Sequence, residues 1–249
     1  MIEVKNISKS FGENHVLKDI SMICKQGETN LIIGESGSGK TVLLKSILGI
    51  HNVDTGQIIY GTENFLEMNH KEKQKIRQEI GMVFQGGALF DSSTVFENIQ
   101  FPLKMFSKMS KKEISNRIRF CLDRVNLHDA DHLYPSEISG GMQKRVAIAR
   151  AIALNPKYLF FDEPNSGLDP KTAIVIDNLI KKLTVEFNTV TVINTHDMNS
   201  VAEIGDNIAF IYEGQKWWTG NKEEIMHSEN KELNEFVFAT ELMRGLKNS

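Results

Sequence analysis

The chain has 249 residues, enough for one large α/β domain or two small ones, and its 41% hydrophobic and 24% charged residues exclude a low-complexity protein. The formal net charge of −3 argues against a general nucleic-acid-binding protein, which normally carries a basic excess. Two cysteines, Cys24 and Cys121, are too few for a disulfide framework, so we expect buried thiols in a reducing compartment.

The sequence shows neither an export signal nor a membrane-spanning segment. Residues 1–10, MIEVKNISKS, already have the pattern of a strand and a turn. No apolar run approaches the roughly 18–20 residues that span a bilayer. We therefore expect a protein that does not cross a membrane but can bind a partner that does.

Strands alternate with helices in the first third of the chain. The predicted strands span residues 2–4, 16–24, 29–34, 55–61 and 80–85. The predicted helices between them span residues 40–48 and 71–79.

The rest of the chain begins with a long helical stretch. Residues 86–155 contain predicted helices at 95–103, 111–127 and 140–154, and no convincing strand. An apolar strand follows in KYLFFDEP, residues 157–164. The elements predicted after it are a helix at 170–187, a strand at 189–196, a hairpin at 207–220, and helices at 221–227 and 231–246.

This order of elements predicts an α/β fold. Short apolar strands that alternate with helices form a mostly parallel sheet with helices on both faces. We expect a core domain at residues 1–220 with a small antiparallel β part, an α-helical subdomain inserted at about 87–155, and a C-terminal helical tail at 221–249.

The segment GESGSGKT, residues 34–41, matches the phosphate-binding pattern G-x-x-x-x-G-K-[ST] and lies between an apolar strand and a helix. Small residues let backbone N–H groups approach phosphate oxygens, and the following helix adds its positive end. This P-loop predicts a P-loop NTPase core that binds ATP and Mg²⁺, with Lys40 on the phosphates and the Thr41 hydroxyl on the metal. The candidate ATP-binding residues here are Gly34, Glu35, Ser36, Gly37, Ser38, Gly39, Lys40, Thr41 and Val42.

Two acidic residues end the apolar strand of YLFFDEP. Asp162 emerges where ligands bind in open α/β sheets, so we predict that it holds Mg²⁺ directly or through water. Glu163 is placed to polarise a water for in-line attack on the γ-phosphate. An Asp-Glu pair alone is more often a solvated turn, and it is the P-loop upstream that favours catalysis.

Two further polar residues end predicted strands. Gln85 follows the strand at 80–84 and is a candidate to contact Mg²⁺ and to sense the γ-phosphate or its water. His196 follows the strand at 189–195, with Asp197 next to it, and is a candidate phosphate contact. A lone histidine after a strand is usually a turn residue, but a third polar residue at a strand end favours a role in the site.

Together with SGG at 139–141 and SGLD at 166–169, these motifs make the chain resemble the ATP-binding subunit of an ABC transporter, over about residues 2–220. The resemblance implies an ATPase in which Phe11 stacks on adenine, although Phe11 could instead anchor the first strand. It also implies a homodimer in which Ser139, Gly140 and Gly141 of one copy contact the γ-phosphate held by the P-loop of the other. We call these three residues the signature loop.

The signature departs from the family's usual LSGGQ at two positions. Ile138 replaces leucine, which is a conservative change, and Met142 replaces glutamine. Methionine cannot hydrogen-bond strongly, so we expect one polar contact to the nucleotide to be missing while the serine and glycine donors remain.

The resemblance implies a separate permease, and a peripheral location on the cytoplasmic face of the inner (cytoplasmic) membrane. Residues 84–103 look most like the ATPases of Mla-type transporters, which predicts phospholipid transport with a lipid-binding substrate subunit. The alternatives are an ATPase of an amino-acid or other small-solute importer, and a nucleotide-gated regulator of a membrane partner. A soluble ABC ATPase of DNA repair or translation is disfavoured, because those usually carry long insertions or tandem units, and no nucleic-acid partner is expected.

Overall fold

The computed structural model describes residues 1–239. Its strands are β1 (Ile2–Phe11), β2 (Asn14–Cys24), β3 (Thr29–Ile33), β4 (Thr55–Tyr60), β5 (Glu63–Asn64), β6 (Ile80–Val83), β7 (Tyr158–Asp162), β8 (Val190–Asn194), β9 (Asn207–Tyr212) and β10 (Gln215–Gly220). Its helices are α1 (Lys40–Ile47), α2 (His70–Gln78), α3 (Val95–Phe106), α4 (Lys111–Arg124), the short 3-10 helix η1 (Pro135–Glu137), α5 (Gly140–Ala151), α6 (Pro170–Phe187), α7 (Met198–Ile204), α8 (Lys222–Met226) and α9 (Lys231–Val237). None of the helices within residues 1–239 is both long and apolar enough to cross a bilayer.

The central sheet has six strands in the order β10-β9-β3-β8-β7-β6. All neighbours are parallel except β9 and β10, which form the predicted antiparallel hairpin. Strands β3, β7 and β8 are buried along their whole length, which explains why apolar residues point to both faces of these strands. The predicted α/β class is therefore confirmed.

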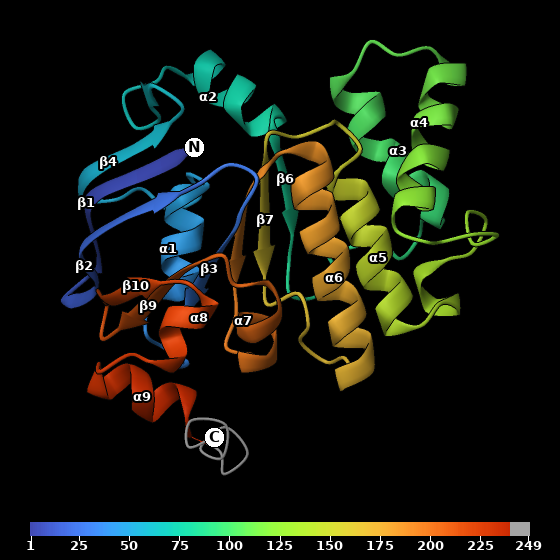
Figure 1. The fold of residues 1–249 in the computed structure, drawn as a ribbon. Helices are drawn as coiled ribbons and strands as arrows, with labels where there is room; N and C mark the ends of the chain where they lie inside the picture. Colours follow the sequence, from blue (N-terminus) through green and yellow to red (C-terminus); the bar gives the residue numbers. More distant parts are fainter. Residues whose placement is uncertain (240–249) are drawn as a thin grey trace.

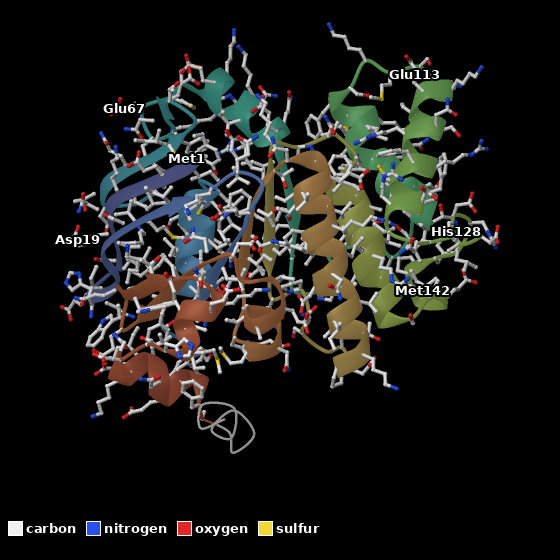
Figure 2. All side chains as sticks on the ribbon, in the orientation of Figure 1. Met1, Asp19, Glu67, Glu113, His128 and Met142 are labelled. Carbon is white, nitrogen blue, oxygen red and sulfur yellow. The ribbon has the colours of Figure 1, made fainter. Side chains whose placement is uncertain are left out.

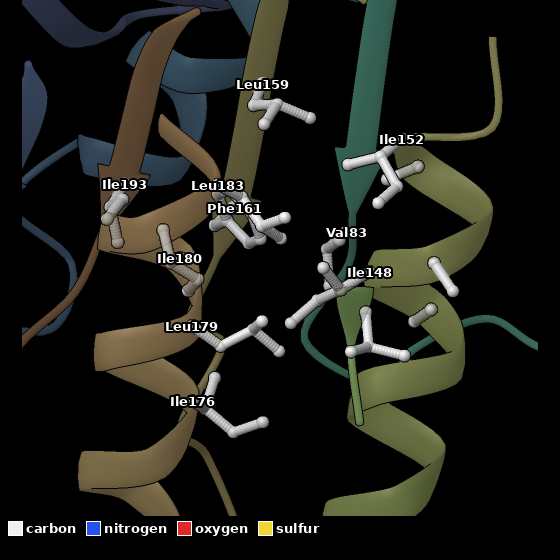
Figure 3. Packing of buried hydrophobic residues seen from close by; sticks show 14 of the residues in the cluster. Val83, Ile148, Ile152, Leu159, Phe161, Ile176, Leu179, Ile180, Leu183 and Ile193 are labelled. Carbon is white, nitrogen blue, oxygen red and sulfur yellow. The ribbon is translucent and has the colours of Figure 1, made fainter. Parts of the chain in front are cut away.

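Successive residues of the central strands pack into two different cores. Leu31 and Phe161 belong to the core that α5 and α6 cover, whereas Ile32 and Phe160 belong to the core on the opposite face. Figure 3 shows the first core, with Val83 next to Ile148 of α5 and Phe161 next to Ile180 of α6. The sheet is thus covered on both faces, as predicted.

A second, antiparallel sheet covers the other face together with α1. Its strand order is β2-β1-β4-β5, and Ile7, Ile20 and Leu43 of this layer are fully buried in the second core. In Figure 1 this sheet lies beside α1, at the side of the molecule opposite α3 and α4. The antiparallel part of the fold is larger than the predicted hairpin at 207–220, because β1, β2, β4 and β5 form a sheet of their own and the hairpin belongs to the central sheet.

The inserted helices begin at defined caps. Thr94 caps α3 and Ser110 caps α4, each in a capping box with a glutamate three residues on, Glu97 and Glu113. Helix α5 leads within seven residues into β7, which runs back along it, so α5 begins at the end of the molecule where the parallel strands finish. Figure 2 places Met142, near this end of α5, far from Glu113 at the α3–α4 connection.

The structure corrects several predicted boundaries. Strand β6 ends at Val83 and β8 at Asn194, so Gln85 and His196 each lie two residues beyond their strand rather than at its end. Helix α7 was not predicted, because its seven residues are too few for a clear apolar period.

The C-terminal segment packs on the core instead of standing apart. Helix α9 ends at Val237, earlier than the predicted 231–246, and Leu233 and Val237 are buried in the first core. The remainder of the predicted helix, and of the tail at 221–249, lies outside the described residues from position 240. The division of the chain at residue 220 stays a prediction.

Candidate nucleotide-binding and catalytic site

A hollow of about 1280 Å³ opens at the carboxyl ends of the parallel strands. Four predicted parts of the site line it: the P-loop, Gln85, the segment 163–167 and the segment 195–199. Residues 235–237 of α9 also line it, which the sequence did not indicate. The fold therefore gathers residues as far apart in sequence as Glu35 and Val237 into one cavity.

Two glycines give the P-loop its shape. Gly34 and Gly39 have φ angles of +149° and +104°, which side-chain-bearing residues rarely adopt. A Cβ on Gly34 would lie 2.2 Å from the Ile211 carbonyl oxygen, so the loop can lie this close to β9 only with glycine there. Gly39 is the N-cap of α1 and offers no side-chain acceptor, which leaves the first N–H groups of the helix available to an anion.

Lys40 is buried and bends back onto its own loop. Its ammonium donates to the carbonyls of Gly34 and Glu35, both at 2.8 Å. Burial lowers the pKa of Lys40, and the nearby carboxylates of Glu163, Asp162 and Glu35 oppose that change. The ammonium therefore lies within the loop that would surround a triphosphate, next to the acidic residues of the site.

A buried hydroxyl group of the P-loop gives further support for triphosphate binding. The Ser38 hydroxyl oxygen is buried and has no hydrogen-bond partner among the described residues. Native structures leave few such atoms without a partner, and a phosphate oxygen on the P-loop would supply one. The glycine cradle, the buried lysine and the unpaired hydroxyl together suit the predicted nucleotide.

Asn194 joins two of the predicted metal ligands. Its side-chain NH₂ donates to the Thr41 hydroxyl at 3.1 Å and to Asp162 Oδ1 at 2.6 Å. The parallel register of β7 and β8 places Asp162 directly beside Asn194, which explains why the amide reaches both groups. A hydroxyl and a carboxylate are oxygen ligands of the kind that Mg²⁺ prefers, so this pair fits the predicted metal.

Gln85 borders the same hollow but is turned toward another residue. Its amide NH₂ donates to the Ser166 hydroxyl at 3.2 Å. The third predicted metal ligand is thus present in the cavity, and its contact is with the segment that follows Glu163 rather than with Thr41 or Asp162.

Two of the three residues predicted to act in hydrolysis, Glu163 and His196, contact each other. Nδ1 of His196 lies 2.7 Å from Oε2 of Glu163, and the carboxylate is mostly buried while the imidazole is exposed. Glu163 has a φ of 51°, in the left-handed region, and its N–H donates to the Asn194 carbonyl at 2.9 Å. A strained backbone of this kind costs about 1–3 kcal/mol and persists at positions that the surrounding structure fixes, as functional residues often are.

Two basic residues of α5, which were not among the predicted site residues, donate hydrogen bonds to the loop that contains Gln85. The buried ammonium of Lys144 donates to the Gln85 carbonyl, and burial lowers its pKa while Glu163 opposes the change. The Arg150 guanidinium donates to the carbonyls of Gly87 and Ala88, both at 2.8 Å. Their positions on the helix that follows the signature loop are the only signal the sequence offered.

The signature loop does not line the hollow of its own chain. Ser139 is exposed and acts as the N-cap of α5, where its hydroxyl accepts a hydrogen bond from the Met142 N–H at 3.2 Å. Gly140 is exposed as well, and a Cβ on Gly141 would lie 2.7 Å from a Thr172 methyl. A single chain therefore presents these three residues at its surface, away from its own P-loop.

The structure shows what replaces the usual glutamine of the signature. The Met142 side chain packs against the first core. The neighbouring Gln143 does not take over a polar role at the surface, because its NH₂ donates inward to the Pro135 carbonyl at 2.8 Å. The expected loss of one polar group at position 142 thus agrees with the packing.

Phe11 lies apart from the hollow. It is 47% exposed at the end of β1, with its ring edge-on to His51 at 5.4 Å and the Lys9 ammonium 5.2 Å from its centre. It does not anchor the strand in the core. An exposed ring is available to stack on a base, and that role stays a prediction.

Comparison with known proteins shows what the whole chain is similar to. The sequence model of a family described as "ABC transporter" matches residues 17–166. The chain is 40% identical to the methionine import ATP-binding protein MetN of Clostridium acetobutylicum over 237 residues, which cover 95% of this chain and 74% of that protein. It is 34% identical to the probable ribonucleotide transport ATP-binding protein mkl of Mycobacterium leprae, over 95% of this chain and 68% of that protein.

Solved structures have the same fold. The dimeric structure of MJ0796, described as a bacterial ABC transporter cassette, superposes with a TM-score of 0.80 at 35% identity and covers 89% of this chain and 99% of that one. A post-hydrolysis state of MJ0796, bound to ADP and Pi, gives 0.79. CbiO1 of Clostridium perfringens, part of the complex cbiONQ, gives 0.85 at 30% identity over 98% of this chain and 97% of that one.

Proposed function

This chain belongs to the ABC transporter family of ATPases, and we propose that it powers the import of a small solute, such as an amino acid, through a separate membrane permease. The observation that carries the proposal is the single hollow that holds Lys40, Thr41, Glu163 and His196. The sequence identity with a methionine import ATPase across 95% of the chain supports the choice of cargo class.

ATP would lie on the P-loop with its phosphates over the first turn of α1. The Lys40 ammonium would exchange its two carbonyl partners for phosphate oxygens, which carry far more negative charge. Thr41 and Asp162 would hold Mg²⁺, and Gln85 would reach it by leaving Ser166. When bound, the metal supplies positive charge that offsets the charge developing on the phosphates.

Glu163 is proposed to orient and activate the attacking water. Its carboxylate is partly shielded from solvent and its position is fixed by the backbone bond to Asn194, so it presents an acceptor at one place in the cavity. His196 would donate to that carboxylate or to a phosphate oxygen from the neighbouring loop that follows β8. The reaction class is phosphoryl transfer to water, and these residues act by position and charge.

We propose that the second half of each site comes from another copy of the chain. Ser139 and Gly140 are exposed at the same end of the molecule as the hollow, yet do not line it. In a head-to-tail dimer the signature loop of one copy would close over the nucleotide of the other, with the N-terminus of α5 directed at the γ-phosphate. Binding then favours closure and hydrolysis favours opening.

The proposed permease contact is an exposed apolar surface on the helical insertion. Three large side chains form its centre: Phe90 and, one turn apart on α3, Phe101 and Met105. Phe90 packs edge-on against Phe101 at 4.9 Å and follows the loop that Arg150 and Lys144 hold to α5. Large apolar side chains exposed together mark an interaction surface, and Phe90 lies five residues after Gln85 in the chain. A permease bound here would place the chain on the cytoplasmic face of the membrane.

Phospholipid is the second candidate cargo, together with a lipid-binding substrate subunit. The residues that favour it are Gly86 to Ser92, where Asp91 and Ser92 stand in place of the proline and histidine typical of polar amino-acid importers. The comparisons support it less well, because the relatives described above are named for methionine and ribonucleotide transport. A nucleotide-gated regulator of a membrane partner would use the same site without a cargo.

Transport assays on the chain and its co-purified membrane partner separate these functions. The complex is placed in vesicles with ATP, and uptake of labelled methionine, of labelled ribonucleoside and of fluorescent phospholipid is measured side by side. The proposal expects ATP-dependent movement of a small solute, abolished by Glu163→Gln. Movement of phospholipid alone would favour the second candidate, and hydrolysis without movement of any solute or lipid would favour the regulator.

A further inference from the structure

Three buried polar side chains form a closed hydrogen-bonded triangle behind the catalytic pair. The Asn165 NH₂ donates to Asp177 Oδ1 and to the Ser200 hydroxyl oxygen, both at 2.9 Å. The Ser200 hydroxyl donates to Asp177 Oδ2, also at 2.9 Å. Asp177 and Ser200 are each 1% exposed. We call these residues the polar triangle.

The chemistry of the triangle fixes each partner's role. A carboxylate can only accept, so the Asn165 side chain must turn its NH₂ toward Asp177. The Asn165 carbonyl oxygen is then left buried and without a partner among the described residues. A buried carboxylate is costly unless it is fully hydrogen-bonded, and here both of its oxygens accept.

The three corners belong to the segments that carry the catalytic side chains. Asn165 comes two residues after Glu163, in the turn before α6. Ser200 comes four residues after His196, in the first turn of α7. Asp177 is on α6, which packs against α7 and into the first core, and so supplies a rigid base for both loops.

We propose that the polar triangle is a positioning device for ATP hydrolysis, which sets the separation between the Glu163 carboxylate and the His196 ring. The inference rests on the roles given to Glu163 and His196 in the proposed function. It adds that Asn165, Asp177 and Ser200, which need not touch the nucleotide, control the rate through the geometry of these two residues.

The surroundings of the two loops explain why such a device is needed. The His196 side chain is 65% exposed, so little packing of its own holds the ring beside the Glu163 carboxylate. Their contact spans only 2.7 Å, and a water must be oriented beside it. Misplacement of a catalytic group by about 1 Å can cost about 100-fold in rate.

A purely structural role for the triangle makes a different prediction. In that case, loss of any buried hydrogen-bonded network on α6 would lower the stability of the protein but would not specifically change kcat. Thr184 offers this comparison, because its buried hydroxyl lies on the same helix and bonds to the Ile180 carbonyl and the Thr191 hydroxyl, both at 2.8 Å. It does not contact the loops of Glu163 or His196.

The test compares four proteins as full chains with their co-purified membrane partner: wild type, Asp177→Asn, the exchange Asn165→Asp with Asp177→Asn, and the control Thr184→Val. In Asp177→Asn the amide oxygen can still accept from Asn165, but the NH₂ replaces the oxygen that accepts from Ser200, so the Ser200 hydroxyl loses its acceptor and the triangle is broken at that bond. In the exchanged pair, the NH₂ at position 177 and the Ser200 hydroxyl both donate to the new carboxylate at position 165, so the Ser200 hydroxyl regains an acceptor.

Three quantities are measured: kcat and KM for ATP, and hydrogen exchange of the amides at residues 195–199. We expect Asp177→Asn to lower kcat at least about tenfold with KM within about twofold, and to speed exchange at residues 195–199. The exchanged pair should recover kcat to within about threefold of wild type, and Thr184→Val should retain wild-type kcat and exchange. Exchange needs no turnover, so it tests the triangle even where hydrolysis is slow.

Three results would overturn the proposal. The first is a folded Asp177→Asn protein with wild-type kcat and wild-type exchange at residues 195–199. The second is an equal loss of kcat in Thr184→Val, and the third is an exchanged pair no better than Asp177→Asn. Failure of the proposed function is recognised separately, because Glu163→Gln would then hydrolyse ATP at the wild-type rate.

Discussion

The ammonium of Lys144 donates a hydrogen bond to the backbone carbonyl of Gln85. It joins the helix that starts at the signature loop to the loop that enters the nucleotide hollow and continues into the apolar surface at Phe90. A shift of Gln85 toward the metal would therefore move α5 and that surface with it. The relationship gives a physical route from the nucleotide to the proposed permease contact.

Lys144→Met should weaken this connection while leaving nucleotide binding intact. Methionine fills a similar volume but cannot donate, so we expect the ATP affinity to stay within about twofold of wild type and solute movement per ATP to fall severalfold. Lys182→Met, an exposed lysine on α6, serves as the control and should resemble wild type. Unchanged coupling in a folded Lys144→Met complex would mean that the bond carries no signal.

Lys40→Ala should severely weaken ATP binding. The variant removes the ammonium that would bind the phosphate oxygens. A loss of about 2–3 kcal/mol corresponds to a rise in Kd of about 30- to 160-fold. Titration calorimetry measures it directly. Lys45→Ala, in the last turn of the same helix, is the matched control. Equal affinities of the two variants for ATP would contradict the role given to Lys40.

Glu163→Gln should bind ATP and remain as a closed dimer. The amide keeps the size of the side chain but cannot act as a base, so the nucleotide that holds the two copies together is not consumed. Gel filtration with ATP and Mg²⁺ should show a dimer that ADP does not support. Glu223→Gln, on α8, should behave as wild type. A Glu163→Gln protein that stays monomeric with its membrane partner present would argue against nucleotide-driven closure.

Asp177 should make the stability of the protein depend on pH. Burial raises its pKa from 3.8 to about 6, opposed by hydrogen bonds from Asn165 and Ser200 and reinforced by the nearby charges of Asp197 and Glu203. A raised folded pKa stabilises the fold fully below pH 3.8, and this contribution is lost as pH rises through about 6. The change corresponds to about 3 kcal/mol.

The side chain at position 177 of the variant Asp177→Asn does not titrate. The difference in free energy of unfolding between the variant and wild type therefore isolates the contribution of Asp177. Between pH 4 and pH 7 the free energy of unfolding of the variant, relative to wild type, should rise by about 2.5 kcal/mol. Urea denaturation at the two pH values measures it, with Thr184→Val as the reference. A pH-independent difference would show that Asp177 titrates normally in the folded protein.

Much of the fold follows from local pattern. The predicted helix at 170–187 has the bounds of α6, because Asp169 and Pro170 signal its start and a long apolar period follows. The P-loop, Asp162 and Glu163 were identified because the residues of each motif are adjacent in the sequence. The strand ends near Gln85 and His196 were set two residues too far. Apolar Phe84 follows the last paired residue of β6, and β-branched Thr195 follows that of β8, so both continue the strand pattern in the sequence.

The missed parts of the site depend on contacts that no local pattern encodes. Asn194 matters because the register of two parallel strands places it beside Asp162. Lys144 reaches Gln85 across 59 positions of sequence, and Asn165, Asp177 and Ser200 meet only once α6 and α7 pack together. The cargo was also predicted from sequence as lipid, whereas the relatives favour a small solute.

The central claim is that each nucleotide is enclosed by the P-loop of one copy and the signature loop of another. It is tested most directly by introducing Ser36→Cys and Ser139→Cys into the Glu163→Gln chain, in which the natural cysteines are both buried. With ATP and Mg²⁺, a short bifunctional crosslinker should join two chains through these positions, and without nucleotide it should not. Absence of an ATP-dependent link between chains, in a protein shown to bind ATP, would contradict the account.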